Sequence, residues 1–430
     1  MIKEMKLIEN LKENKLEYLF YLLVFLLPLQ TRWIFGDATY QGEVFEYGRF
    51  SLYTYDILLF ILLVISFFNK KRVKIDKVFT CFGLFALFSL LSSFWADEKM
   101  VNSYFGIRMI FGLGLFYLVQ KISFSKTRLA TTVVLAGALQ GLLGVWQFVN
   151  QGVAGSKWLG MSGQSARELG ASVVEFGLER WLRAYGSLPH PNIYGALLVI
   201  SFIGLIYLVS KVEQKYHKIF LLGSGSVIVL GILFSYSRAA WIGLGLALVF
   251  GIGYSLIFKD RDKKKFGKIF FAYLLLLIIL FSYVTLPIIK TRLHMGETTR
   301  LETISNMERV AGYKAAKRIF SDNWLVGVGA GGYAYELRDR HPDEKVWYIH
   351  PVHNVPLLIL VELGIIGLGI LFVSVGFMVM ELLKKRKWNY VGILLLLFIL
   401  MMFDHFWWTA GSGIYILWLT LGIVQKASKE

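Results

Sequence analysis

The sequence predicts an all-α polytopic membrane protein with about 12 transmembrane helices. Hydrophobic residues make up 56% of its 430 residues and charged residues only 17%, whereas soluble domains are nearer 45–50% and 25%. The apolar residues form blocks of about 18–22 residues, which span a hydrocarbon core of about 30 Å as helices. A transmembrane β-barrel is also excluded, because its strands would be about 10 residues long and would alternate apolar with polar residues. These observations exclude a soluble enzyme and a disordered chain, and the single cysteine, Cys81, excludes a disulfide scaffold.

Each apolar block is interpreted as one helix, and the whole chain, 1–430, as a single integral membrane domain. The predicted helices are 16–35, 51–68, 78–95, 102–120, 129–149, 191–210, 219–236, 239–258, 269–290, 354–383, 391–406 and 411–425. Two connections are long, 150–190 and 291–354. The second lies between the ninth and tenth helices and includes a basic segment, 306–320, with a helical pattern.

The distribution of lysine and arginine predicts the orientation, because cytoplasmic connections of membrane proteins carry an excess of both. Alternate short connections and the two termini hold 27 of the 46 basic residues, in runs such as 70–72, 263–265 and 384–387. Both termini are therefore predicted to be cytoplasmic, and the two long connections extracytoplasmic. This topology, with lipid headgroup contacts, also accounts for the net charge of +17, so no nucleic-acid partner is expected.

Arg238 is the first functional candidate, because ionisable residues within or beside membrane spans are costly. It lies between two apolar stretches with almost no loop. We expect its guanidinium at the extracytoplasmic mouth of the two helices, where it could bind a passing lipid phosphate. The alternative is an arginine that only extends to lipid headgroups.

His353 is the second candidate. It precedes Asn354, a predicted N-cap, and Pro356, which suits a first helical turn. The free N–H groups at a helix N-terminus favour an anion and disfavour a charged imidazole. We therefore expect a neutral, basic His353 that could act in catalysis.

Two further polar segments border predicted helices. Two prolines flank His190 just before Asn192, the predicted N-cap of the sixth helix, and Arg183 lies a few residues earlier. This segment is either a rigid helix start or a contact for substrate. Asp404 and His405 lie between the last two helices, where they either satisfy each other or orient another histidine.

The glycines of residues 327–332 formally match the dinucleotide-binding pattern G-x-G-x-x-G. They follow a helix instead of a strand and lack a βαβ unit, so we interpret them as a tight turn. No local cluster has the spacing of a metal site. We therefore expect neither a metal ion nor a cofactor.

Five motifs occur in order between residues 180 and 368. They are R-A-Y-G-S-L-P-H-P-N from Arg183, S-R-A-A-W from Ser237, E-R-V-A-G-Y from Glu308, N-W-L-V-G-V-G-A-G-G-Y from Asn323, and H-N-V-P-L-L-I-L-V-E-L-G-I-I-G from His353. Together they resemble the O-antigen ligase family. That family includes lipopolysaccharide ligases, polysaccharide polymerases and bacterial protein O-oligosaccharyltransferases.

The resemblance implies a GT-C-type glycosyltransferase of the bacterial cytoplasmic (inner) membrane. Such an enzyme moves a glycan from undecaprenyl diphosphate to an acceptor, such as a lipid A core, on the extracytoplasmic face, with inversion and without metal. Arg238 and Arg309, the arginine that opens the loop helix, would bind the diphosphate, and His353 would be the catalytic histidine. Ala239 departs from the glycine that usually follows the S-R pair.

Ligase is the function favoured by the motifs. A polysaccharide polymerase or a protein O-oligosaccharyltransferase would share the same site and donor. A lipid-linked glycan flippase is a more distant alternative. It should show charged or broken helices near the membrane midplane and internal repeats, and the two halves of the sequence show no convincing repeat.

Overall fold

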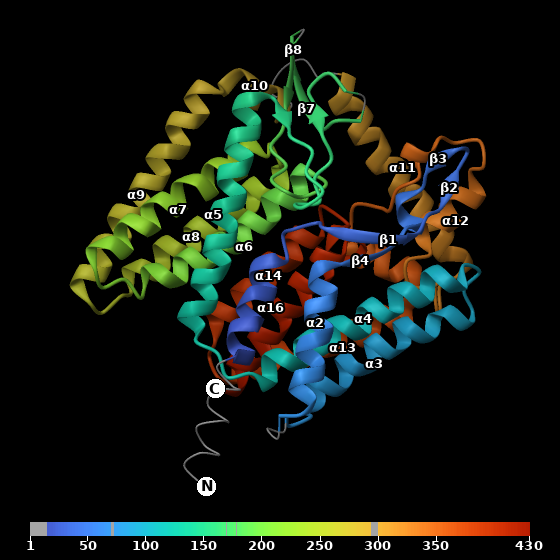
Figure 1. Ribbon diagram of the computed structural model, residues 1–430, viewed down its shortest axis with the longest axis horizontal. Coiled ribbons are helices and arrows are strands. Elements are labelled where there is room, and N and C mark those ends of the chain that lie inside the picture. The colour runs from blue at the N-terminus through green and yellow to red at the C-terminus, as the bar shows by residue number, and fades with distance from the viewer. Residues whose placement is uncertain (1–14, 70–72, 169, 178, 294–299) are drawn as a thin grey trace. The chain divides into compact units, whose positions relative to one another are not determined.

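The computed structural model describes residues 15–69, 73–168, 170–177, 179–293 and 300–430, and these are mostly helical (Figure 1). Eight helices among them are long and apolar enough to cross a membrane. They are Lys77–Phe94 (α3, Lys77–Leu91, continued by the short helix η2, Ser92–Phe94), α4 (Lys99–Lys121), α5 (Lys126–Asn150), α6 (Pro191–Val209), α7 (Lys215–Phe234), α8 (Arg238–Leu256), α9 (Arg261–Val284) and α13 (Val355–Lys384). The chain is therefore a polytopic membrane protein.

The described chain forms two compact units. The first contains the described residues of 15–19, Arg32–Ser123 and Asn306–Glu430. Besides α3, α4 and α13 it holds β1 (Arg32–Gly36), β2 (Thr39–Tyr40), β3 (Glu43–Val44), η1 (Glu46–Gly48), β4 (Phe50–Tyr53), α2 (Thr54–Phe67), α12 (Tyr333–Arg340), η3 (Val346–Tyr348), α14 (Trp388–Met401), α15 (Phe406–Thr409) and α16 (Gly411–Lys429). Its core forms where α4 packs on α16 and α3, and α3 packs on α13.

The second unit contains Phe20–Thr31 and Phe124–Ser305. Besides α5–α9 it holds α10 (Leu286–Arg292) and four short strands, β5 (Gly152–Val153), β6 (Gln164–Ser165), β7 (Val173–Phe176) and β8 (Glu179–Leu182). Helix α5 packs on α6 and α7, and α8 packs on α9. The boundary between the units falls within α11 (Arg300–Asp322).

Small residues allow the membrane helices to approach closely, as expected where lipid offers little hydrophobic driving force. In the first unit, a side chain at Gly112 of α4 would overlap Trp418 of α16. In the second unit, a side chain at Gly141 of α5 would meet the backbone of Val227 in α7.

The structure corrects the first predicted helix, 16–35. Residues 15–26 are helical, but Arg32–Gly36 form β1, which pairs antiparallel with β4. Pro28 disfavours helix for the residue before it. From Arg32 the exposure alternates along the chain, as it does in a strand. The apolar residues Trp33, Ile34 and Phe35 extended the hydrophobic run without extending the helix.

The predicted count of twelve spans is not reached among the described residues. The helices expected at 51–68 and 391–406 are α2 and α14, with 14 residues each. The last predicted helix is α16, which is preceded by the separate short helix α15. The ninth predicted helix starts earlier, at Arg261, and α10 follows it with a proline in its first turn. The expectation of an all-α chain is also too simple, because the described residues include eight short strands between the helices.

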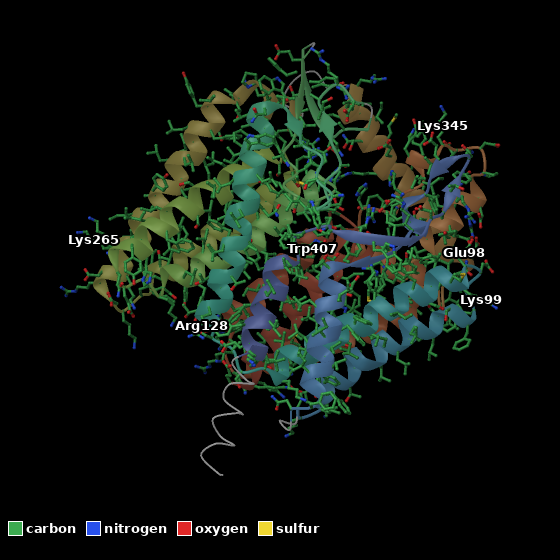
Figure 2. The ribbon with its side chains drawn as sticks, in the orientation of Figure 1. Glu98, Lys99, Arg128, Lys265, Lys345 and Trp407 are labelled. Atoms are coloured by element: carbon green, nitrogen blue, oxygen red, sulfur yellow. The ribbon has the colours of Figure 1, made fainter. Side chains whose placement is uncertain are left out.

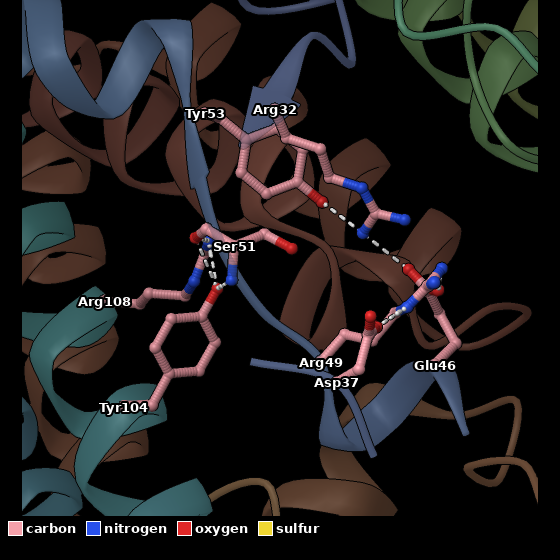
Figure 3. Close-up of polar contacts among 8 residues, drawn as sticks. All are labelled: Arg32, Asp37, Glu46, Arg49, Ser51, Tyr53, Tyr104 and Arg108. Atoms are coloured by element: carbon pink, nitrogen blue, oxygen red, sulfur yellow. Dashed lines mark hydrogen bonds and ion pairs between the residues drawn. The ribbon is translucent and has the colours of Figure 1, made fainter. Parts of the chain in front are cut away.

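A buried polar cluster joins α2 and α4 of the first unit. Arg108 of α4 lies 3.6 Å from the carboxylate of Asp56 in α2, donates to the carbonyl of Ser51 at 2.9 Å and contacts the Tyr104 hydroxyl. Asp56 also accepts from the hydroxyl of Tyr415 in α16 at 2.6 Å. Figure 3 shows Arg108, Tyr104 and Ser51 beside β4. The intramembrane charge of Arg108 is therefore compensated within the fold.

Candidate active site

His353 lies directly before the N-cap of α13. Asn354 is the cap, because its Oδ1 accepts the N–H of Leu357 at 2.9 Å, and Pro356 occupies the first turn. This confirms the prediction for Asn354. His353 is thereby held at the N-terminal end of α13, where the free backbone N–H groups favour negative charge.

Three ionisable side chains from a distant segment and from the same loop surround the His353 ring. Asp404, between α14 and α15, places Oδ2 3.9 Å from His353 Nδ1. The ring centroids of His350 and His405 lie 5.4 Å and 5.1 Å from that of His353. The structure therefore brings together four predicted residues, because Asn354 adjoins His353 and Asp404 adjoins His405.

Local hydrogen bonds fix the Asp404–His405 segment at the start of α15. Asp404 Oδ1 accepts the N–H of Phe406 at 3.3 Å, and His405 Nδ1 shares a hydrogen bond of 2.8 Å with Thr409 Oγ1. Asp404 is buried. Its remaining oxygen, Oδ2, is the atom directed towards His353.

The surroundings of His353 favour its neutral form. Burial lowers the pKa of His353 below its usual 6.5, the charge of Asp404 opposes this, and His350 and Arg309 lower the pKa further. Burial, followed by the charge of Asp404, raises the pKa of Tyr47 in η1, whose ring centroid is 6.2 Å from that of His405. His353 is thus an imidazole ready to accept a proton, beside a carboxylate that stabilises the imidazolium.

Arg309 supplies positive charge to the same cluster from α11. The expectation that Arg309 opens the loop helix is wrong, because α11 begins at Arg300 and Arg309 lies well inside it. The Tyr333 hydroxyl donates to the carbonyl of Gly312 in α11 at 3.3 Å. In the part of the chain that the structure describes, no carboxylate pairs with the half-buried Arg309. Its guanidinium is therefore available for an anion.

His353, Asp404 and His405 also form a group that could hold a metal ion, with one ligand atom from each within 4.8 Å of the others. Two imidazoles and a carboxylate suit zinc or a similar divalent ion. The sequence did not predict this group because the two segments that supply it are far apart in the chain.

Arg238 lies in the second unit, at the turn between α7 and α8. Helix α7 ends at Phe234 and α8 begins at Arg238, with Ser237 as its N-cap. This confirms the predicted tight connection. Tyr236 adopts a left-handed backbone conformation with φ of 45°, which is costly for a bulky residue and reverses the chain within three residues.

Two buried arginines hold this turn through its carbonyl groups. Arg183 donates to the carbonyl of Ser235 at 2.7 Å, and Arg292 of α10 donates to that of Tyr236 at 2.8 Å. Arg292 also pairs with Glu302. Arg292 is not among the residues predicted from the sequence; its place between an apolar run and a long polar segment was the available signal. Arg183 and Arg292 therefore fix the backbone of the turn that precedes Arg238.

The structure assigns the remaining two candidates to the start of α6. His190, not Asn192, is the N-cap, because its Nδ1 accepts the N–H of Asn192 at 3.1 Å. Asn192 lies inside the helix, and its Oδ1 accepts from Arg183 at 2.7 Å. The prediction of Asn192 as the cap is therefore wrong, since a histidine nitrogen can fill the same role.

The fold and the two clusters define a polytopic membrane protein with a histidine–aspartate site and a separate arginine-rich turn. Residues 223–372 match the family model described as O-antigen ligase. This match confirms the predicted resemblance to the O-antigen ligase family. The matched segment includes Arg238, Arg309, His353 and Asn354. No curated protein matches the chain.

Proposed function

We propose that the protein is an O-antigen ligase-like glycosyltransferase. It moves a glycan from undecaprenyl diphosphate to an acceptor hydroxyl, such as that of a lipid A core, on the extracytoplasmic side of the bacterial cytoplasmic membrane. The observation that carries the proposal is the pairing of His353 with Asp404, beside Arg309, which has no carboxylate partner among the described residues. His353 and Arg309 both lie in the segment matched by the family model.

His353 is the proposed general base. Its Nδ1 faces Asp404, so Nε2 is the nitrogen left to receive a proton from the acceptor hydroxyl. The separation of 3.9 Å exceeds a hydrogen bond, and such contacts often tighten only when substrate binds. Asp404 then stabilises the imidazolium that forms.

The bond changes of the proposed reaction balance without a further reactant. The acceptor oxygen attacks the anomeric carbon and gives its proton to His353, while the bond from that carbon to the phosphate oxygen breaks. The diphosphate leaves with the bonding electron pair, and attack opposite to it inverts the anomeric centre. Arg309 neutralises the growing negative charge, since guanidinium groups bind phosphate through paired donors. The resemblance to the family implies that Arg238 also contacts the diphosphate.

A lipid-linked glycan flippase is the alternative that one observation favours. Helix α13 is broken at Gly364, next to the buried Glu362, and broken helices with intramembrane charges are typical of transporters. However, the Glu362 carboxylate already accepts hydrogen bonds from Gly331, Tyr333 and Trp408. It is engaged in the fold, so the transferase remains the better proposal.

Purified protein in lipid vesicles tests the proposal directly. It is incubated with an undecaprenyl-diphosphate-linked glycan and, in turn, lipid A core, a second lipid-linked glycan, or a Ser/Thr-containing peptide. One discrete product on lipid A core supports the ligase. A ladder would indicate a polymerase, and a glycosylated peptide would indicate a protein glycosyltransferase. Movement of the donor across the vesicle membrane without glycan transfer would favour the flippase.

The same assay with a chelator tests the metal question. Because the arginines carry the charge compensation, we expect EDTA to leave the rate unchanged. Loss of the rate, restored by zinc, would show that His353, Asp404 and His405 hold a catalytic ion.

A further inference from the structure

Glu362 lies at a break in α13, nine residues beyond His353. Gly364 takes φ of 64° and ψ of −171°, which interrupts the helix. The chain segment 324–332 docks along this break. Val328 and Gly329 donate to the carbonyls of Val361 and Glu362 at 3.1 Å and 2.8 Å. The break therefore converts the middle of α13 into an edge to which another segment is hydrogen-bonded.

The glycines of this docked segment are needed for its conformation. Gly327, Gly329 and Gly331 all have φ between 72° and 95°, the left-handed region that favours glycine. A side chain at Gly327 would overlap the backbone of Glu362. The segment precedes α12 and follows α11, so no strand leads into it. The glycines therefore allow the close approach of this segment to the backbone of α13.

The Glu362 side chain joins this segment to the element beside the catalytic pair. Its Oε2 accepts the N–H of Gly331 at 2.7 Å and the indole Nε1–H of Trp408 at 2.6 Å. Its Oε1 accepts the N–H of Tyr333, at the start of α12, at 3.4 Å. The side chain is 1% exposed. A buried carboxyl group that accepts several hydrogen bonds holds its partners in place.

Trp408 belongs to α15, which starts directly after Asp404 and His405. The bond from Trp408 to Glu362 therefore ties the start of α15 to α13, and α13 itself begins beside His353. Asn354 adds a weaker tie from the start of α13, with Nδ2 3.5 Å from the carbonyl of Met402. The approach of Asp404 to His353 thus depends on how α15 is held against α13.

We propose that Glu362 is a positioning residue for the His353–Asp404 pair, acting through Trp408 of α15. This inference rests on the proposed transferase function. Glu362 does not touch the reacting atoms. Its carboxylate sets the geometry in which Asp404 orients the base, and misplacement of a catalytic group by about 1 Å can cost roughly 100-fold in rate.

The chain offers a matched pair of variants. Trp408→Phe removes the indole donor to Glu362, whereas Trp407→Phe removes an Nε1–H that has no hydrogen-bond partner within the described residues. Both indoles are almost fully buried, and Trp407 is labelled in Figure 2. The two variants therefore lose the same atoms from neighbouring positions, but only one loses the bond to Glu362.

Glu362→Gln provides the conservative rescue. A glutamine can place its carbonyl oxygen at the site of Oε2 and keep the bonds from Gly331 and Trp408. Its amide nitrogen would then face only the N–H of Tyr333, the longest of the three contacts. Glu362→Ala keeps none of these bonds.

Glycan transfer and donor binding are measured for each variant, with rates normalised to the protein that binds donor. We expect Glu362→Ala and Trp408→Phe to lower kcat about 10- to 100-fold with little change in KM for donor. Glu362→Gln and Trp407→Phe should keep most of kcat. A merely structural role would reduce the amount of active protein and leave its kcat intact.

Three results would overturn the proposal: unchanged kcat in Trp408→Phe, equal losses in Trp407→Phe and Trp408→Phe, or a Glu362→Gln enzyme as slow as Trp408→Phe. All three results can be measured even if Glu362→Ala fails to fold, because none of them uses that variant. A wild-type protein that transfers no glycan would contradict the proposed function instead, so the two failures are distinguishable.

Discussion

The environment of His353 separates a catalytic role from a structural one. If His353 is the base, His353→Ala should bind donor normally and lose turnover by about 10²- to 10⁴-fold, the usual contribution of a positioned base. His353→Gln should be equally inactive, because an amide cannot accept the proton. The measurement is single-turnover transfer beside a thermal melt of each variant. A folded, active His353→Gln enzyme would remove His353 from the catalytic residues.

The pKa of His353 predicts the pH dependence of the rate. The neutral imidazole is the active form, so the rate should fall as the pH drops through this pKa. Burial lowers the pKa below 6.5, and the acid limb should therefore lie below pH 6.5. Asp404→Asn removes the charge that raises this pKa, so the limb should move to still lower pH while the maximal rate falls.

This pH profile is measured as kcat with EDTA present, so that no bound ion contributes to the titration. His350, His405, Tyr47 and Arg309 also face the cluster. His350→Gln serves as a control, because it removes one repulsive partner and should shift the limb upwards. An acid limb unmoved in Asp404→Asn would show that Asp404 does not act on the titrating group.

Arg309 and Arg238 are each predicted to contact the donor diphosphate. Replacement by alanine should weaken donor binding by about 1.5–3 kcal/mol, the contribution of a hydrogen bond to a charged group. Lysine should restore binding only in part, since the paired donors are lost. Arg318→Ala is the matched control on α11, because Arg318 is exposed on the same helix. Donor affinity equal to wild type in either variant would remove that arginine from the site.

At the scale of the elements, apolar run length predicted most of the long helices, because a bilayer core requires about 20 residues of any helix that crosses it. Run length could not predict β1, since apolar residues such as Trp33 and Phe35 occur in strands as well as in helices. It also missed the break in α13. Glycine at 364 is compatible with a straight helix, and only the docked segment 324–332 makes the left-handed conformation favourable.

The candidate site was predicted one residue at a time. Helix-capping rules placed His353 and Asn354 correctly at the start of α13, because capping depends on neighbouring residues. The sequence could not decide whether Asp404 contacts His353, since this contact depends on how α15 packs against α13. Arg292 and Glu362 have polar partners elsewhere in the chain, and only the folded structure reveals those partners.

Gly364 offers a direct test of the break in α13. Gly364→Ala would place a side chain against the backbone of Leu325 and force alanine into a left-handed conformation, so it should destabilise the protein by about 1–3 kcal/mol. Gly369→Ala is the control, since a side chain there meets nothing within 4 Å. It should be neutral or stabilising by up to about 1 kcal/mol. Thermal unfolding in detergent distinguishes the two, and equal melting temperatures would argue for a continuous helix.

At the scale of the whole molecule, the orientation in the membrane is still a prediction from charge. The basic segments that carry it lie partly outside the described residues, at 1–14 and 70–72. Others are described: Lys265, labelled in Figure 2, lies near the start of α9 and is exposed. Because basic segments stay on the cytoplasmic side, the opposite ends of the same helices are expected to face outwards.

Cysteine labelling in intact cells tests this orientation. With Cys81 replaced by alanine, Ser321→Cys should react with a membrane-impermeant maleimide, because exposed Ser321 lies near the end of α11 in the long 291–354 connection. Lys265→Cys should react only after the cells are opened, since it lies in a basic connection predicted to be cytoplasmic. The two positions are both exposed, so access to the reagent, and not burial, decides the outcome. The reverse pattern would invert the topology and place the histidine–aspartate cluster on the cytoplasmic side, where the proposed transfer to an extracytoplasmic acceptor could not occur.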